Sequence, residues 1–124
     1  LPIADFFIYG DDLEYTHRLK KEKPCYLDMD SSILHKAPSN KGADIATAGV
    51  DRIPRFFYQS RNGMYVARKD KKVLLRFAEV GRRTLRILKE APDYKGKRIW
   101  MLAKGTICGL VYNPQIEYPN SHRV

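Results

Sequence analysis

The sequence predicts an α+β fold, in which a mixed, mostly antiparallel β-sheet packs against one main α-helix and carries β-hairpins. Three observations lead to this prediction. An aromatic run broken by Asn62-Gly63 favours a hairpin, because Asn-Gly tolerates the positive φ of a tight turn. Apolar residues recur at helical spacing over residues 80–91. Two further apolar runs flank Lys104-Gly105 and favour a second hairpin.

Residues 1–50 are predicted to be mainly irregular and acidic. The expected elements are a short strand over 3–9, a polar turn at 10–12, a charged segment over 18–23 that ends at Pro24, a short strand over 25–27, and a loop over 36–49 with at most one helical turn.

Residues 51–124 are predicted to form a basic β-meander, a helix and a hairpin. The expected strands are 55–60, 64–68 and 73–77, with a charged turn at 69–72, and the final hairpin pairs 97–103 with 106–112. The helix has one apolar face, made by Val80, Thr84, Ile87, Leu88 and Ala91. Pro92 cannot continue a helix and is expected to end it.

Length and composition indicate a single domain over residues 1–124. Hydrophobic residues make up 44% and charged residues 30%, which favours a globular chain over a disordered one. No apolar run approaches the roughly 20 residues of a membrane helix, so no membrane partner is expected. The chain starts at Leu1, which indicates a processed product or a piece of a larger protein. Cys25 and Cys108 are too far apart for a metal knuckle. Two reduced thiols are favoured over one disulfide of a secreted product, and this interpretation favours an intracellular setting.

The charge distribution indicates an anionic partner. The net charge is +9, but residues 1–50 hold six Lys/Arg and eight Asp/Glu, whereas residues 51–124 hold seventeen and six. The second part therefore carries +11 against −2 for the first. A basic surface kept for solubility would give the same asymmetry, and so would a surface that docks on an acidic neighbour in a parent protein.

Short motifs offer weaker indications of catalysis. Residues 9–12, Tyr-Gly-Asp-Asp, resemble the metal-binding turn of RNA polymerase palms, and residues 26–32 resemble the haloacid-dehalogenase phosphatase signature with Asp28 and Asp30. An acidic turn and a capped helix start are the favoured interpretations. The histidines at 17, 35 and 122 are expected at the surface, but one of them with Glu117 and a nearby Arg could serve a ribonuclease.

Aromatic and basic residues interleave along the expected strands. Phe57, Tyr58, Tyr65, Phe77 and Trp100 fall among Arg55, Arg61, Arg68, Arg76 and Arg98. Aromatic rings on strands stack on bases, and nearby cations neutralise phosphates. Strand alternation places only some of these rings outside the core.

One stretch resembles a known family. Residues 79–91, Glu-Val-Gly-Arg-Arg-Thr-Leu-Arg-Ile-Leu-Lys-Glu-Ala, followed by residues 98–105, look like the centre of the cap-binding domain of influenza-type polymerases, which segmented negative-strand RNA viruses share. That domain has a strand with Phe before a Val-Gly-Arg-Arg turn, then a helix with an Ile-Leu pair, then a strand ending in Gly. The resemblance spans residues 77–105 of this chain.

The resemblance implies a non-catalytic domain, excised from a viral RNA-directed RNA polymerase, that binds the 7-methylguanosine cap of host mRNA. Such binding supports cap-snatching, in which capped leaders prime viral transcription. Two aromatic rings sandwich the methylated purine, an acid reads the guanine edge and cations hold the triphosphate. The implied partners are capped RNA or 7-methyl-GTP and the rest of the viral polymerase, in the host cytoplasm or nucleus. No cofactor, metal or catalytic residue is expected.

Phe77 matches the family's pocket Phe, whereas Lys71 and Leu75 stand where the family has its stacking His and reading Glu. Either cap binding is therefore lost, or the chain has a rebuilt pocket. Its cap-base stacking residues would come from Tyr58, Tyr65, Phe77 and Trp100, its base-reading acid from Glu79 and Glu90, and its phosphate-binding residues from Arg68, Lys72, Arg83 and Lys89. The alternatives are a general RNA-binding or interaction module without cap preference, and a small basic ribonuclease.

Overall fold

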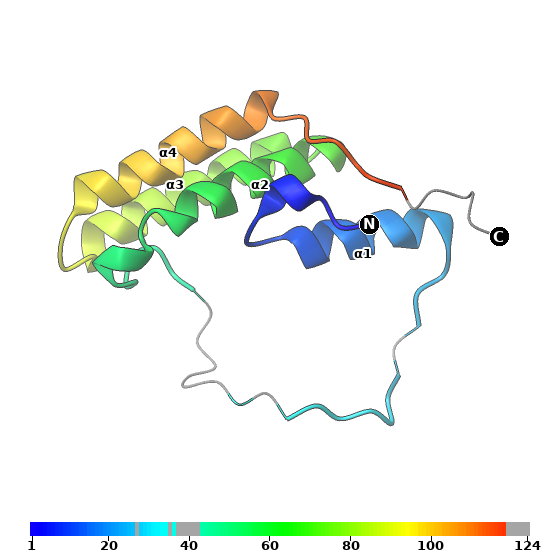
Figure 1. Cartoon of the computed structure of the whole chain (residues 1–124). Helices are drawn as coiled ribbons and strands as arrows, with labels where there is room; N and C mark the ends of the chain where they lie inside the picture. Colours follow the sequence, from blue (N-terminus) through cyan, green and yellow to red (C-terminus); the bar gives the residue numbers. More distant parts are fainter. Residues whose placement is uncertain (27, 35, 37–42, 119–124) are drawn as a thin grey trace.

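Helices make up all the regular secondary structure in the part of the chain that the structure describes (Figure 1). The structure is a computed structural model, and it describes residues 1–26, 28–34, 36 and 43–118. The helices are η1 (Ala4–Phe6), α1 (Asp11–Glu22), η2 (Val50–Arg52), α2 (Arg55–Lys69), α3 (Val73–Glu90) and α4 (Lys95–Val111). These residues contain no β-strand, so the predicted α+β fold with its sheet and hairpins is wrong.

The closest packing joins α2 and α4, and α3 packs on both of them. Gly105 and Gly109 of α4 lie directly on the backbone of α2, where a Cβ at Gly105 would meet Ser60 Cβ at 2.7 Å. Because glycine has no side chain, the two helix backbones approach each other closely. Figure 1 shows α2, α3 and α4 side by side, with α1 along the lower edge of this bundle.

The predicted meander over 55–68 is a single helix, because its buried residues follow the helical period. Phe56, Ser60, Met64 and Ala67 are separated by four, four and three residues, and all four are buried. The expected hairpin turn at Asn62-Gly63 lies in the middle of α2. Aromatic content suggested strands, but packing on one face outweighs this weak local preference.

The predicted hairpin over 97–112 is also a single helix. Arg98, Leu102, Gly105 and Gly109 are buried at intervals of four, three and four residues, which places them on one side of α4. Gly105, expected at a turn, instead lies within the α2–α4 contact.

The helix predicted over 80–91 is confirmed in part. It lies within α3, which ends at Glu90 shortly before Pro92 but begins at Val73, where a strand was expected. Ile87 and Ala91 of the predicted apolar face are in the core, whereas Leu88 is half exposed.

The N-terminal segment is more regular than expected. Residues 4–6 form η1 instead of a strand, and the charged segment over 18–23 belongs mostly to α1. Gly10 caps α1 with φ 83°, so Asp11 and Asp12 lie in the first helical turn, where negative charge is favourable. The expected strand over 25–27 is irregular at Cys25 and Tyr26. Leu27, His35, His122 and residues 37–42 of the expected loop lie outside the described residues.

Two groups of buried residues form the core. The larger one comprises Ile45, Ala46, Phe56, Ile87, Ala91 and Leu102, so the segment before α2 covers the α3–α4 end. The smaller one comprises Ile3, Phe6 and Tyr65, with Tyr112 and Ile116 packed against it. The N-terminal ammonium of Leu1 donates to the Glu117 carbonyl at 3.1 Å, which joins the two terminal segments.

Cys25 is exposed and Cys108 half-buried, and both are free thiols. Among the described residues, no helix has the length and apolar character needed to cross a bilayer.

Candidate functional site

Five lysines converge where α1 and α2 end. Lys20 and Lys21 come from the last turn of α1, Lys69 from the last turn of α2, and Lys71 and Lys72 from the turn into α3. We call these five residues the lysine cluster. With His17 and Asp70 they line a concavity of about 610 Å³, and Asp70 is the only acidic residue in this lining. All five lysines are exposed.

The α2–α3 turn presents two of these lysines through a Schellman motif. The Lys72 amide donates to the Ala67 carbonyl at 2.7 Å and the Lys71 amide to the Arg68 carbonyl at 3.2 Å. This motif requires a left-handed residue, and Lys71 occupies that position with φ 58°. Glycine is the usual residue there because a side chain costs about 1 kcal/mol. Lys71 is exposed and lines the concavity from this position.

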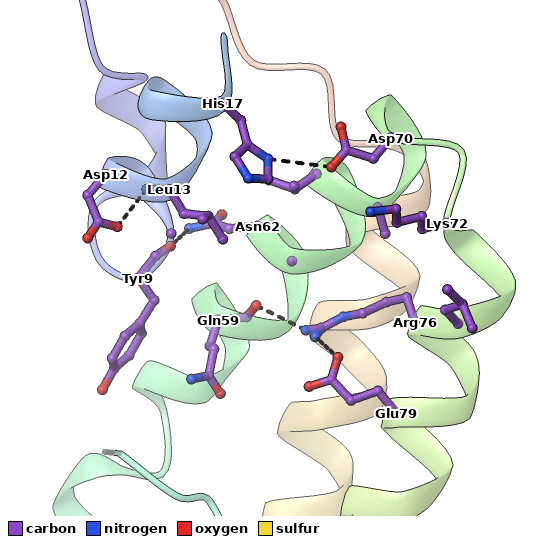
Figure 2. Close-up of a pocket in the computed structure, with 15 residues that line it drawn as sticks. Tyr9, Asp12, Leu13, His17, Gln59, Asn62, Asp70, Lys72, Arg76 and Glu79 are labelled. Atoms are coloured by element: carbon purple, nitrogen blue, oxygen red, sulfur yellow. Dashed lines mark hydrogen bonds and ion pairs between the residues drawn. The ribbon is translucent and has the colours of Figure 1, made fainter. Parts of the chain in front are cut away.

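His17 and Asp70 face each other across the α1–α2 junction (Figure 2). His17 Nδ1 lies 3.5 Å from Asp70 Oδ2, and Lys21 Nζ lies 3.9 Å from Asp70 Oδ1. The same pair also borders two neighbouring cavities of about 530 and 310 Å³. The His17–Asp70 pair is therefore where three concavities meet.

The 530 Å³ cavity is a groove with α2 as its floor and with α1 and α3 as its walls (Figure 2). Arg76 of α3 lies over Gly63 of α2, whose missing side chain makes room for the guanidinium. Arg76 donates to the Gln59 carbonyl at 3.3 Å and pairs with Glu79 at 2.5 Å. Its Nε is buried and has no hydrogen-bond partner among the residues that the structure describes. Leu13, Val66 and Leu75 make the remaining surface partly apolar.

Asn62 holds α1 in place beside α2. Its side-chain nitrogen donates to the carbonyls of Phe6, Ile8 and Tyr9 at 3.0, 3.1 and 2.9 Å, and the residue is 1% exposed. This clamp fixes the chain just before α1 begins, so the orientation of α1 and of His17 depends on it.

The residues expected to stack on a cap base are spread over three helices. Tyr58 on α2 contacts Phe7 and Phe57. Tyr65, also on α2, is 2% exposed and packs against Phe6 and Tyr112 in the core. Phe77 on α3 and Trp100 on α4 are both substantially exposed. The ring contacts of Tyr58 and Tyr65 are therefore with other aromatic residues. Neither ring contacts a second member of the expected stacking set.

The expected base-reading acids are both paired. Glu79 lies between Arg76 and Arg83, and Glu90 pairs with Arg86 at 2.8 Å. Partial burial raises the pKa of the Glu79 carboxyl, but the two guanidinium groups more than offset this and hold the pKa below its ordinary value.

Only Lys72 of the four expected phosphate-binding residues lies in the lysine cluster. Arg68 donates to the carbonyls of Gly109 and Tyr112 at 3.1 and 2.8 Å, where it caps the end of α4. Arg83 bonds Gln59 and Glu79, and Lys89 is exposed on α3. Cap binding by the full expected set stays a prediction.

Sequence reasoning missed Lys20, Lys21, Lys69, Lys71 and the His17–Asp70 pair as site residues. Both lysine-bearing segments were visible as charged stretches, at 18–23 and 69–72. Their separation by about fifty residues hid the fact that the fold joins them. No three potential metal ligands gather among the described residues, including those around Asp11 and Asp12.

The fold and site define a small helical bundle with a cationic, concave end. Comparisons with protein-family models, with curated proteins and with solved structures found no match for this chain.

Proposed function

We propose that this domain binds single-stranded RNA through the phosphate backbone, with the lysine cluster as the contact surface. The observation that carries the proposal is the convergence of five exposed lysines around one concavity. Lysine ammonium groups are flexible point charges, which suits contacts with phosphates rather than with base edges. The net charge of +9 also speeds the approach of a polyanion.

The left-handed Lys71 and the isolated Asp70 add support. Lys71 presents an exposed ammonium to the concavity from a turn position that glycine would occupy at lower cost. Asp70 faces His17 and Lys21, which orders the imidazole and one cluster lysine at the edge of the concavity.

The test is fluorescence anisotropy of a labelled RNA of about 12 nucleotides, titrated with the protein at several salt concentrations. Each phosphate contact with single-stranded RNA contributes a slope of about −0.7 in log affinity against log salt, so four or five lysines predict about −3. The test variant changes all five cluster lysines to Gln and should lose most of the affinity and of the slope.

A matched control removes the same number of charges elsewhere. Its five substitutions to Gln are at exposed cations outside the cluster: Arg52, Arg55, Arg82, Lys89 and Lys97. This control should keep most of the affinity. Equal losses in both variants would show that binding follows net charge and would reject the lysine cluster as the site.

The same titration addresses the cap prediction. Adding 7-methyl-GTP and GTP as competitors measures any preference for the methylated base. A clear preference would favour the cap-binding function, which remains a proposal together with its intracellular viral setting. Equal competition would favour the general RNA-binding alternative.

The His17–Asp70 pair supports a second candidate, cleavage of bound RNA. Pairing of Nδ1 with a carboxylate orients an imidazole and leaves Nε2 free to act as a base. In the proposed step His17 takes the ribose 2′-hydroxyl proton, the 2′-oxygen attacks phosphorus, and the 5′-oxygen leaves with a proton from water. The product is a 2′,3′-cyclic phosphate. His17→Ala should abolish cleavage and keep RNA binding. If the unmodified protein forms no cleavage product, this second candidate is rejected.

A further inference from the structure

The outward sides of α3 and α4 carry large apolar side chains that the fold leaves uncovered. On α3 these are Leu74, Leu85 and Leu88, which are 84%, 61% and 50% exposed. On α4 they are Trp100, Ile107 and Val111, which are 59%, 64% and 83% exposed. We call these six residues the α3–α4 face.

Helical spacing places the members of each set on one side of their helix. Leu74, Leu85 and Leu88 are eleven and three residues apart, and Trp100, Ile107 and Val111 are seven and four apart. On α3, Arg76 and Arg83 turn toward α2, since both bond Gln59, and the leucines lie on another side. On α4, Gly105 and Gly109 face α2, and the exposed residues lie opposite them. α3 and α4 pack side by side (Figure 1). Both apolar sides therefore contribute to the outer surface of this helix pair.

No charged residue lies between the two rows of apolar side chains. The positions there are Phe77, Gly81, Ala103 and Leu110. An exposed apolar surface of this extent on a small chain marks a docking site.

Cations border the α3–α4 face along both helices. Arg82 and Lys89 follow its edge on α3, and Lys97 and Lys104 follow its edge on α4. All four are exposed, and α4 contains no acidic residue. A second copy would place these cations against one another, so the border disfavours self-association. The complementary partner is apolar at its centre and anionic at its edges.

A lipid surface has this chemistry. Interfacial helices bury Trp and Leu at the headgroup boundary while Lys and Arg flank them at the anionic headgroups. The six residues of the α3–α4 face do not line the cavities of about 530, 310, 260 and 610 Å³. From the apolar surface and its cationic border, we infer that the α3–α4 face docks on an anionic membrane surface. The sequence predicts no membrane partner because it lacks a membrane-spanning apolar run, and docking on a membrane surface requires no such run.

The test uses the whole chain with vesicles of phosphatidylcholine alone or with about 30% phosphatidylserine. Flotation measures binding, and the emission of Trp100, the only tryptophan, measures insertion. Flotation with phosphatidylserine vesicles and a blue shift of Trp100 are expected, with little binding to neutral vesicles. Quenching by lipids brominated on their acyl chains should confirm contact with the hydrocarbon.

Neighbouring leucines of α3 supply the matched control. Leu74→Ser combined with Leu85→Ser and Ile107→Ser should weaken binding at least about tenfold, because three apolar side chains lose their burial. Leu75 is 68% exposed but lies on another side of α3, so Leu75→Ser should bind as the unmodified protein does. Circular dichroism checks that each variant folds.

Three results would overturn the inference. Flotation of the triple variant with unchanged strength would show adsorption by charge alone. Absence of flotation together with a dimer in solution would assign the face to a second copy. Absence of flotation together with binding of an acidic amphipathic peptide would assign it to a protein partner. Gln variants of the lysine cluster should retain the Trp100 shift, so failure of RNA binding and failure of lipid docking are distinguishable.

Discussion

Gly109 of α4 lies against Met64 of α2 so closely that a Cβ at Gly109 would stand 2.6 Å from the Met64 Cβ. Gly105, one turn earlier, makes a similar approach to Ser60. This pair of contacts sets the distance between the two helices on which the rest of the bundle is built.

Replacing Gly109 with Ala should therefore destabilise the fold, although Ala is the better helix former by about 1 kcal/mol. Overpacking of a closed contact costs about 1–3 kcal/mol and outweighs that gain. Gly81, in the interior of α3, has open space at its Cβ position, so Gly81→Ala should raise stability instead. Urea denaturation measures the change in unfolding free energy for each variant. If both changes had the same sign, the close α2–α4 packing would be contradicted.

Asn62→Asp should detach the N-terminal segment from α2. The carboxylate cannot donate to the carbonyls of Phe6, Ile8 and Tyr9, so one buried and two partly buried hydrogen bonds are lost. A loss of about 2–3 kcal/mol is expected, together with faster amide exchange over residues 1–10. The exposed Asn113→Asp change serves as the control and should leave both quantities unchanged.

Glu79→Gln should alter the pH dependence of stability. The pKa of Glu79 is held below its ordinary value of 4.5 by Arg76 and Arg83, against the raising effect of partial burial. A lowered pKa means that this carboxylate contributes stability above pH 4.5 and loses it as the pH falls through the folded-state pKa.

The gap in unfolding free energy between the unmodified protein and Glu79→Gln should therefore close as the pH falls from 4.5 through the lowered folded-state pKa of Glu79. The gap at neutral pH should stay near 1 kcal/mol or less and shrink with salt, since this carboxylate is only partly buried. A gap that widened with acidification would contradict the ion-pair arrangement.

Lys71→Gly should separate stability from RNA binding. Glycine adopts φ 58° freely, so the unfolding free energy should rise by up to about 1 kcal/mol. The loss of one phosphate contact should reduce the salt slope of RNA binding by about 0.7. Lys71→Gln keeps the strained backbone and should show the same binding loss without the gain in stability.

Asp70→Asn should strengthen RNA binding. It removes the single negative charge from the lining of the lysine cluster, so a several-fold rise in affinity at low salt is expected. Asp51→Asn changes the net charge equally at an exposed position elsewhere and should have a smaller effect. Weaker binding by Asp70→Asn would indicate that Asp70 acts mainly by orienting His17 and Lys21.

The sequence by itself determined the features that depend on local chemistry. The helical register of Val80, Ile87 and Ala91, the end of that helix before Pro92 and the charged turn at 69–72 could all be predicted. The excess of cations after residue 50 was equally visible, because charge is a sum over residues and needs no coordinates.

Only the tertiary structure decided between strand and helix for residues 55–68 and 97–112. Aromatic residues and Asn62-Gly63 favour a hairpin locally, but such preferences amount to a few tenths of a kcal/mol per residue. Burial of Phe56, Met64 and Leu102 on single helix faces contributes several kcal/mol, and this energy exists only when the helices meet. The lysine cluster has the same origin, because Asn62 holds α1 beside α2 and so joins cations that the chain places about fifty residues apart.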